Sequence, residues 1–193
     1  MNQTIVEGAG HGLVAGGFLA AGYEYVNLDD WYAERGPDGT LRALPSKFPD
    51  GLAALSGRLH ALGLKFGVYS ASSQRTCGNY SASLFQEARD ATTMAHDWQI
   101  DMLKYDACLY QSDIMSAARY AAMRDALNAT GRRIFFSMEG CNGCAADWAP
   151  HTGNMWRTGN DIWPKWDQVA FKNKQICSSR RRRGKRKKKE EEE

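Results

Sequence analysis

The sequence lacks three features that would assign it to common classes of protein. No apolar run reaches the roughly 18–20 residues that a membrane-spanning helix needs, so no membrane partner is predicted. No GxGxxG or GxxxxGKS/T motif follows any strand-like run, which disfavours a nucleotide-binding site. The histidines have no metal-ligand spacing, so no metal and no other cofactor is predicted; they are His11, His60, His96 and His151.

A signal peptide is also absent, because residues 1–10 lack the required basic-then-apolar pattern. Five cysteines and the N-x-S/T sequons at Asn2, Asn79 and Asn128 nevertheless favour an oxidising, glycosylating compartment. We therefore expect the natural N-terminus to lie upstream of Met1.

The net charge of +3 comes from the C-terminal end. Nine of the 25 Lys and Arg residues lie in 180–189, and four of the 22 acidic residues form 190–193. The rest carries 16 basic and 18 acidic residues, so no nucleic-acid partner is predicted for the body. We expect 173–193 to be a disordered basic and acidic tail, either solvated or translated past a broken reading frame. A nucleic-acid role would depend on this tail alone.

Strand-like and helical patterns alternate along residues 1–172, which we expect to form one domain. Expected strands cover 23–28, 65–70, 101–105, 134–138 and, more weakly, 154–158. Expected helices cover 13–21 (ending at Gly22), Asp50 to Gly63, a stretch from a Ser83–Gln86 capping box to Trp98, 112–130, and 163–170. Gly36 to Gly39 predicts a loop. The alternation predicts parallel βα units of a β/α barrel, with an open doubly wound sheet as the alternative.

Acidic residues follow these strand-like runs: Asp29, Asp30, Asp106, Glu139 and Asp161. The carboxyl ends of parallel strands form the mouth of a β/α barrel, where active sites lie. The pattern therefore predicts an acidic site at that mouth.

Two cations accompany these acids. Lys104 lies two residues before Asp106, hence on the same face of its strand, where its charge would keep that carboxylate ionised. An ordinary ion pair at the barrel rim explains the same pattern. Arg157 and Asp161 could likewise form a surface i,i+4 pair, and Asp29 with Asp30 could be a turn pair.

Together these segments resemble the α-galactosidases of glycoside hydrolase family 27. The resemblance covers roughly residues 5–170 and lies in GYEYVNLDD, FPDGLAALSGRLHALGLKFGVYS, TCGNYSAS, DMLKYDACLY, NATGRRIFFSMEG and GNMWRTGNDI, in the family's order. It implies a (β/α)8 barrel, here without its first and last strands, and a retaining hydrolase for terminal α-linked galactose. No metal or cofactor is implied.

The resemblance also implies residue roles. Asp106 corresponds to the nucleophile and Asp161 to the general acid/base. Substrate contacts are implied for Asp29, Asp30, Tyr69, Lys104, Glu139, Arg157 and Trp31. Cys77 and Cys108 correspond to a disulfide between two active-site loops, whereas Cys141 and Cys144 form a CxxC that the family does not place there.

The chain departs from the family pattern in several places. The opening strand, the last two barrel strands and the C-terminal antiparallel β domain are not found, Trp31 replaces a frequent cysteine, and Ala71 replaces a frequent aspartate. We expect poor stability and little turnover from this chain alone.

Two alternatives to an α-galactosidase remain. One is an α-N-acetylgalactosaminidase, disfavoured because charged Glu139 fills the space an acetamide would need. The other is an inactive galactose-binding remnant. By resemblance the protein is secreted, lysosomal or vacuolar, and the full-length family includes homodimers.

Overall fold

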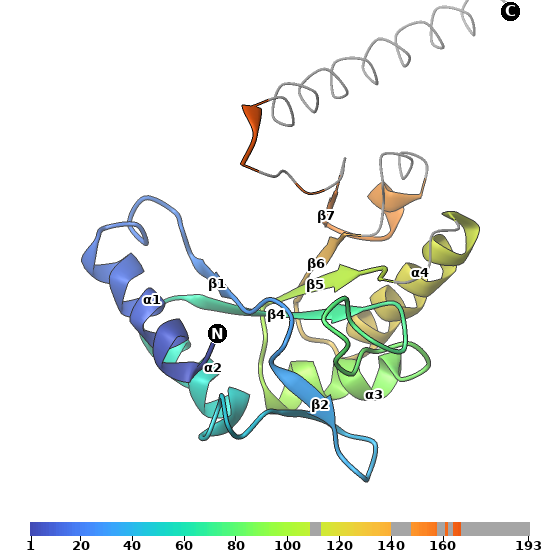
Figure 1. Cartoon of the computed structure of the whole chain (residues 1–193). Helices are drawn as coiled ribbons and strands as arrows, with labels where there is room; N and C mark the ends of the chain where they lie inside the picture. The colour runs from blue at the N-terminus through green and yellow to red at the C-terminus, as the bar shows by residue number, and fades with distance from the viewer. Residues whose placement is uncertain (109–112, 140–147, 158–160, 162–163, 167–193) are drawn as a thin grey trace, which may run out of the picture.

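A five-stranded parallel sheet organises the computed structural model, which describes residues 1–108, 113–139, 148–157, 161 and 164–166 (Figure 1). The strand order is β1 (Tyr25–Asn27), β4 (Lys65–Ala71), β5 (Met102–Asp106), β6 (Phe135–Met138) and β7 (Met155–Trp156). Every neighbouring pair is parallel. Because a doubly wound sheet reverses its strand order at a switch point, this order excludes that alternative for the described strands. All five predicted strands are confirmed, with ends shifted by one or two residues.

Helices flank the sheet, and none in the described part of the chain is long and apolar enough to cross a membrane (Figure 1). They are α1 (Gln3–Ala15), α2 (Gly51–Ala61), α3 (Glu87–Thr92) with a π-helical turn η1 (Thr93–Asp97), α4 (Asp113–Ala129) and a 3-10 turn η2 (Ala149–His151). Helix α1 packs on α2, and α3 packs on α4. One apolar core joins the helices to the sheet. Among its fully buried members are Leu52, Leu55, Leu59, Phe66, Leu103, Tyr105 and Tyr120.

The first helix lies further toward the N-terminus than the prediction of residues 13–21. Asn2 caps it, since its Oδ1 accepts a hydrogen bond from the Ile5 N–H at 3.1 Å. Gly16 is the C-cap, and Gly17 follows in the left-handed region with φ of 74°. The apolar residues from Gly17 to Gly22 therefore form turns instead of continuing the helix.

The predicted Ser83–Gln86 capping box is wrong. The Ser83 hydroxyl is buried and lies 2.6 Å from the Ser70 hydroxyl, so it is used inside the core and not at a helix end. Helix α3 starts later, at Glu87, after an N-cap Gln86 that makes no side-chain cap bond. Asp50 likewise makes no side-chain cap bond to α2.

A small antiparallel hairpin was predicted only as a loop. Its strands are β2 (Ala33–Arg35) and β3 (Leu41–Ala43), joined by the turn at 36–39. Arg35 fixes the hairpin to α3, because its two terminal nitrogens donate to the two carboxylate oxygens of Asp90 at 2.8 and 2.7 Å. Asp90 is fully buried, so this bidentate pair anchors the hairpin.

The sheet is strongly curved. The rings of Tyr25 in β1 and Phe135 in β6 lie 6.4 Å apart between centroids, although β4 and β5 separate those strands. Both side chains are 37% exposed on this concave face. Gly67 of β4 leaves the space that Asn27 of β1 occupies, since a Cβ there would collide with the Asn27 side chain. The described strands therefore form the wall of a barrel.

Most of the predicted helix at 163–170 falls outside the described residues, which include only 164–166 of it. So do the predicted domain boundary at 172, the tail at 173–193, and the pair Cys141 and Cys144.

Candidate active site

Strand register brings the predicted site residues to one edge of the sheet. Ala71 of β4 is paired with Asp106 of β5, at the carboxyl ends of both strands. The next strands continue this alignment, because the Glu139 N–H donates to the Tyr105 carbonyl at 2.8 Å and the Arg157 N–H donates to the Met138 carbonyl at 2.9 Å. Asp106, Glu139 and Arg157 therefore follow one another across neighbouring strands at the barrel mouth.

Asp106 is held at the end of β5 by two donors. The Tyr69 hydroxyl donates to Asp106 Oδ2 at 3.1 Å, and the Ala107 N–H donates to Oδ1 at 2.8 Å. Burial, together with the charges of Asp106 and Asp30, raises the pKa of the Tyr69 phenol far above its ordinary value. Tyr69 therefore keeps its proton and stays a hydrogen-bond donor to the carboxylate.

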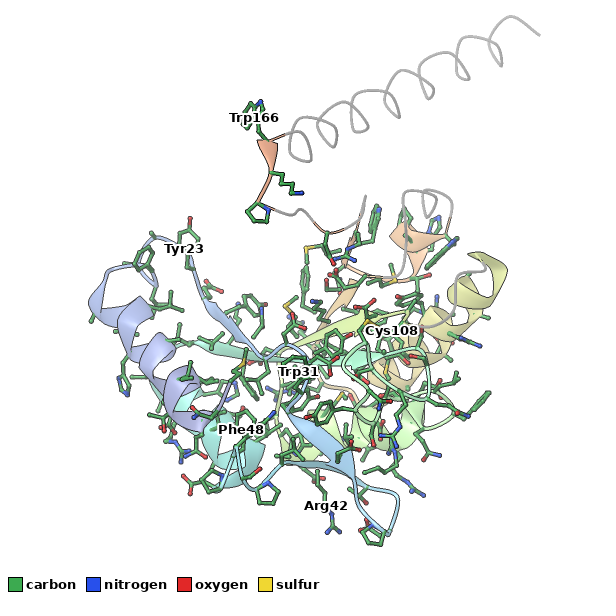
Figure 2. All side chains as sticks on the ribbon, in the orientation of Figure 1. Tyr23, Trp31, Arg42, Phe48, Cys108 and Trp166 are labelled. Atoms are coloured by element: carbon green, nitrogen blue, oxygen red, sulfur yellow. A yellow bond between two sulfur atoms is a disulfide. The ribbon has the colours of Figure 1, made fainter. Side chains whose placement is uncertain are left out.

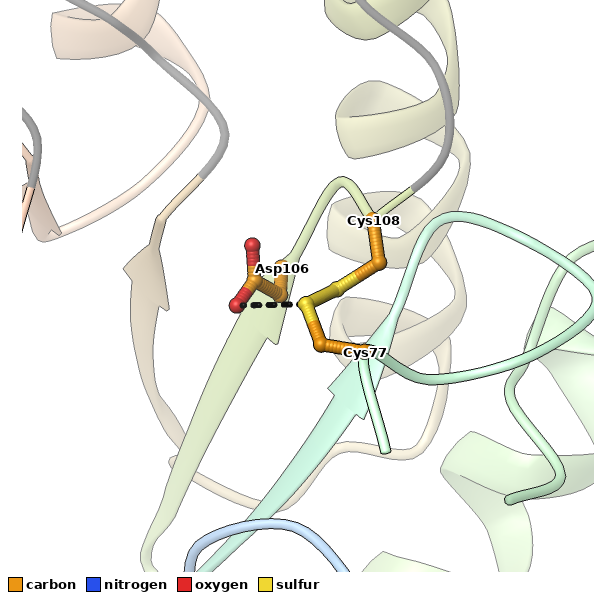
Figure 3. A group of neighbouring side chains, drawn as sticks. All are labelled: Cys77, Asp106 and Cys108. Carbon is orange, nitrogen blue, oxygen red and sulfur yellow. Dashed lines mark hydrogen bonds between the residues drawn. A yellow bond between two sulfur atoms is a disulfide. The ribbon is translucent and has the colours of Figure 1, made fainter. Parts of the chain in front are cut away.

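The predicted disulfide between Cys77 and Cys108 is confirmed, with 5.1 Å between the two Cα atoms. Figure 3 shows it beside Asp106, with Cys77 Sγ 3.7 Å from Asp106 Oδ2. A disulfide sulfur has no proton, so this approach is a contact and not a true hydrogen bond. The three side chains are close enough to ligate a metal ion, but the S–S bond removes both thiolates that such a site would need. The bridge thus positions a loop against Asp106.

Lys104 pairs with Asp29 and not with Asp106. Its ammonium lies 2.7 Å from Asp29 Oδ2 and 5.2 Å from the centre of the Tyr69 ring. Partial burial raises the pKa of Asp29, but hydrogen bonds from Lys104 and the Asp30 N–H, with the charges of Lys104 and Arg157, outweigh it. The net pKa of Asp29 is therefore lowered, and the carboxylate stays ionised as an acceptor.

Asp30 organises the adjacent loop. Its Oδ1 accepts from the Trp31 N–H and its Oδ2 accepts from the Gly78 N–H, both at 2.7 Å. Trp31, which is labelled in Figure 2, leads toward β2. Its indole lies directly against Gly78, where no side chain would fit. Trp31 is 58% exposed and has a left-handed φ of 74°. Asp30 and Trp31 line a shallow crevice together with Tyr69, Thr76 and Tyr80.

Three residues that contact this part of the site were not predicted from the sequence. The Lys47 ammonium donates to the Trp31 carbonyl at 2.7 Å and lies over the Tyr80 ring at 5.5 Å from its centre. Gly78 supplies both the N–H and the space described above. Gly78 and Tyr80 could have been noted because both lie in the TCGNYSAS motif, but no sequence signal marks Lys47.

Arg157 joins the other two predicted acids. Its Nε lies 3.2 Å from Glu139 Oε2, and its Nη2 donates to Asp161 Oδ1. Glu139 is mostly buried, whereas the Asp161 side chain is 71% exposed. The i,i+4 ion pair between Arg157 and Asp161, which was predicted as the ordinary alternative, is therefore present. Arg157 also forms a second ion pair with the more buried Glu139. Because the backbone N–H groups of Arg157 and Glu139 bond to the ends of β6 and β5, this cluster belongs to the same mouth.

The mouth therefore combines several carboxylates, two cations, a phenol hydroxyl and an exposed indole. Such acceptors and donors suit a ligand with many hydroxyl groups, and an aromatic ring suits the apolar face of a sugar. Fold and site define the class as a β/α-barrel protein with an acidic site at the mouth of the barrel.

Comparison with known proteins gives the family. The family profile described as "Melibiase_2: Alpha galactosidase A" matches residues 2–180, so the chain belongs to this family. It is 40% identical over 169 residues to Alpha-galactosidase A of Cellvibrio japonicus, covering 86% of this chain and 41% of that protein. The chain thus spans less than half of this relative's length.

Solved structures agree with this assignment. The structure is similar to α-galactosidase I from Mortierella vinacea with a TM-score of 0.81 and 38% identity, covering 84% of this chain and 43% of that one. It is also similar to an α-galactosidase from Saccharomyces cerevisiae solved with raffinose, with a TM-score of 0.78 and 32% identity, covering 86% of this chain and 39% of that one. The predicted partial β/α barrel of the α-galactosidase family is confirmed.

Proposed function

We propose that this chain provides the catalytic site of an α-galactosidase, which removes terminal α-linked galactose from oligosaccharides, glycolipids or glycoproteins. The observation that carries the proposal is the Asp106 carboxylate at the end of β5, held by Tyr69 and aligned with Glu139 and Arg157. Family membership and the similar yeast enzyme solved with raffinose support a galactoside as substrate.

The proposed mechanism is a retaining double displacement. Asp106 attacks the anomeric carbon and forms a glycosyl–enzyme ester while Asp161 protonates the departing oxygen. Asp161 then takes a proton from water, which attacks the anomeric carbon and releases Asp106. A retaining enzyme needs these carboxyl groups about 5–5.5 Å apart when substrate is bound. The exposure of Asp161 is compatible with exchange of protons with solvent.

The remaining groups bind the sugar in this proposal. Asp29 and Asp30 accept hydrogen bonds from the hydroxyls that distinguish galactose from glucose, while Lys104 donates to its ring hydroxyls. Glu139 and Arg157 lie near the 2-hydroxyl, and Tyr69 with Trp31 lines the pocket. A wrong epimer would leave such charged groups without partners, which is costly in a desolvated pocket.

Secretion, or delivery to a lysosome or vacuole, belongs to the same proposal. The disulfide between Cys77 and Cys108 supports it, because such bonds persist in oxidising compartments. A homodimer, as in the full-length family, is proposed for the complete protein, and neither nucleic acid nor membrane is proposed as a partner.

A mechanism-based label tests the nucleophile without requiring turnover. The chain would be incubated with a galacto-configured cyclitol epoxide, reduced, digested with trypsin and mapped by mass spectrometry. We expect one adduct in the peptide of residues 105–119, located on Asp106 and lost in Asp106→Asn. The gluco-configured epoxide serves as the matched control and should not label.

Two results would contradict the proposal. The first is the absence of this adduct in a sample whose circular dichroism and Cys77–Cys108 disulfide show the native structure. The second is stronger labelling by a 2-acetamido analogue than by the galacto probe, which would favour an α-N-acetylgalactosaminidase.

A further inference from the structure

One sequon lies in the loop that the disulfide fastens beside the candidate site. Asn79 begins Asn79-Tyr80-Ser81, two residues after Cys77, and its side chain is exposed. The Asn79 N–H donates to the Thr76 carbonyl at 2.9 Å, which closes a turn. Within the described residues its carboxamide has no hydrogen-bond partner. The backbone thus holds the turn and leaves the amide nitrogen free.

The conformation of Asn79 presents this amide at the tip of the turn. Its φ of 67° lies in the left-handed region, which asparagine enters more readily than most residues with a side chain. Tips of such exposed turns tolerate added groups, so the folded chain can accommodate a glycan that was attached before folding.

The other two sequons are engaged differently. The Asn2 carboxamide oxygen caps α1 by accepting from the Ile5 N–H at 3.1 Å. Asn128 lies in the last turn of α4, and the Thr130 hydroxyl of its sequon donates to the Leu127 carbonyl at 2.7 Å. Asn79 is therefore the sequon whose asparagine is placed in an exposed loop and is not part of a helix or its cap.

We propose that Asn79 is an acceptor site for an N-linked glycan, added in the oxidising compartment where the neighbouring disulfide forms. The donor is an oligosaccharide linked to a lipid diphosphate. The Asn79 Nδ2 attacks the anomeric carbon of its first sugar, so that a C–N bond forms and the C–O bond to phosphate breaks. The lipid diphosphate leaves with the electron pair of that bond, and Nδ2 loses one proton.

The modification precedes packing of the loop. In the folded chain the Ser81 hydroxyl donates to Glu34 Oε2 and accepts from the Arg35 N–H at 3.1 Å, so the sequon hydroxyl is already occupied. Transfer to the chain as it enters the compartment avoids this competition. For the same reason Ser81 variants would disturb the hairpin and are unsuitable for a test.

A glycan on Asn79 would flank the entrance to the candidate site. The N–H of the preceding residue, Gly78, donates to the Asp30 carboxylate, and the Trp31 indole packs against the Gly78 backbone. The first sugars would therefore lie in the neighbourhood of the exposed indole. This location is independent of whether the proposed galactosidase activity holds.

The test measures occupancy at each sequon separately. The full chain, fused to a cleavable signal peptide, would be secreted from a eukaryotic host, reduced and digested with trypsin. Asn79 falls in the peptide of residues 76–89, Asn2 in that of 1–35 and Asn128 in that of 125–132. We expect peptide 76–89 to carry an N-glycan that peptide N-glycosidase removes. Asn79→Asp, which keeps the side-chain shape, should lose the glycan and its gel shift.

A bare peptide 76–89 overturns the proposal if a co-secreted reporter sequon is glycosylated in the same cells. A glycan on Asn2 or Asn128 with Asn79 unmodified overturns it equally. Because transfer occurs before folding, either result is decisive even if the secreted chain is unstable.

Discussion

At the scale of single residues, the geometry of the barrel mouth depends on which carboxylate oxygen accepts a hydrogen bond from which donor. Asp29 and Asp30 are adjacent in sequence, yet they have different tasks. Asp29 meets the Lys104 ammonium, whereas both oxygens of Asp30 accept backbone N–H groups. Asp30 thus shapes the loop that Trp31 and Gly78 share, and only lone pairs left over from those bonds can bind a ligand.

The lowered pKa of Asp29 predicts a small, pH-limited contribution to stability. A carboxyl whose native pKa lies below its unfolded value of 3.8 stabilises the fold above that pH and loses the effect as pH falls through the native pKa. We therefore expect Asp29→Asn to lower the free energy of unfolding at pH 6 and to have less effect near pH 3. Because the Asp29 side chain is 57% exposed, solvent screening limits the loss to about 1 kcal/mol or less.

Urea unfolding of both proteins, followed by tryptophan fluorescence at pH 6 and pH 3, checks this. Lys104→Met should remove the same interaction at pH 6. A stability difference between Asp29→Asn and the parent chain that grows as the pH is lowered would refute the assignment.

The sequence predicted which residues reach the mouth, because an acid after each apolar run must lie at the carboxyl end of a parallel strand. It could not predict the pairing among them. Lys104 is two residues from Asp106 in sequence, yet its salt bridge reaches Asp29, which is 75 residues away. Such a choice depends on curvature of the sheet, which brings β1 and β5 side chains together across β4.

At the scale of elements, the β2–β3 hairpin depends on one buried ion pair. Arg35 donates to both oxygens of Asp90, and Asp90 is fully enclosed by α3 and its neighbours. Removing the acid would leave a mostly buried guanidinium without its counter-charge, which is strongly destabilising. We predict that Asp90→Ala lowers the free energy of unfolding by about 3 kcal/mol.

The matched control is Asp38→Ala in the turn of the same hairpin. Asp38 pairs with Arg42 at 2.6 Å, but both side chains are more than half exposed, so we expect a much smaller loss than for Asp90→Ala. The urea concentration at the midpoint of unfolding measures both effects, provided that the dependence of the free energy of unfolding on urea concentration is the same in the variants and the parent chain. Equal losses for the two variants would show that burial does not distinguish these pairs.

Sequence reasoning succeeded for elements with strong periodicity and failed where local signals competed. The strands were found because their apolar runs are continuous. The hairpin was missed because β2 and β3 have three residues each, with charged Glu34, Arg35 and Arg42 among them. Ser83 resembled a helix cap, but its buried contact with Ser70 shows that tertiary packing decided its role.

At the scale of the whole molecule, the concave face and the two outer strands are uncovered in the part of the chain that the structure describes. Tyr25, Phe135 and Met155 expose apolar surface there, while β1 and β7 each pair on one side only. Unpaired strand edges and apolar patches promote association between chains. We predict that the 193-residue chain, purified as it stands, binds an apolar fluorescent dye, self-associates on concentration and shows little turnover of an aryl α-galactoside.

Light scattering after size exclusion, dye fluorescence and a release assay check these three outcomes. Tyr25→Ser together with Phe135→Ser is expected to lower dye binding. A monomer that does not bind the dye and that hydrolyses the aryl galactoside would contradict the prediction.

The contact between Tyr25 and Phe135 has a wider meaning. The two rings pack against each other on the concave face although two strands separate them in the sheet. This packing favours the curved form of the sheet over a flatter one. Additional strands, whatever their source, would meet edges whose spacing and tilt are already determined. Strands that complete the barrel would then pair with the edges of a sheet that is already curved, and closing the barrel would require little further bending of that sheet.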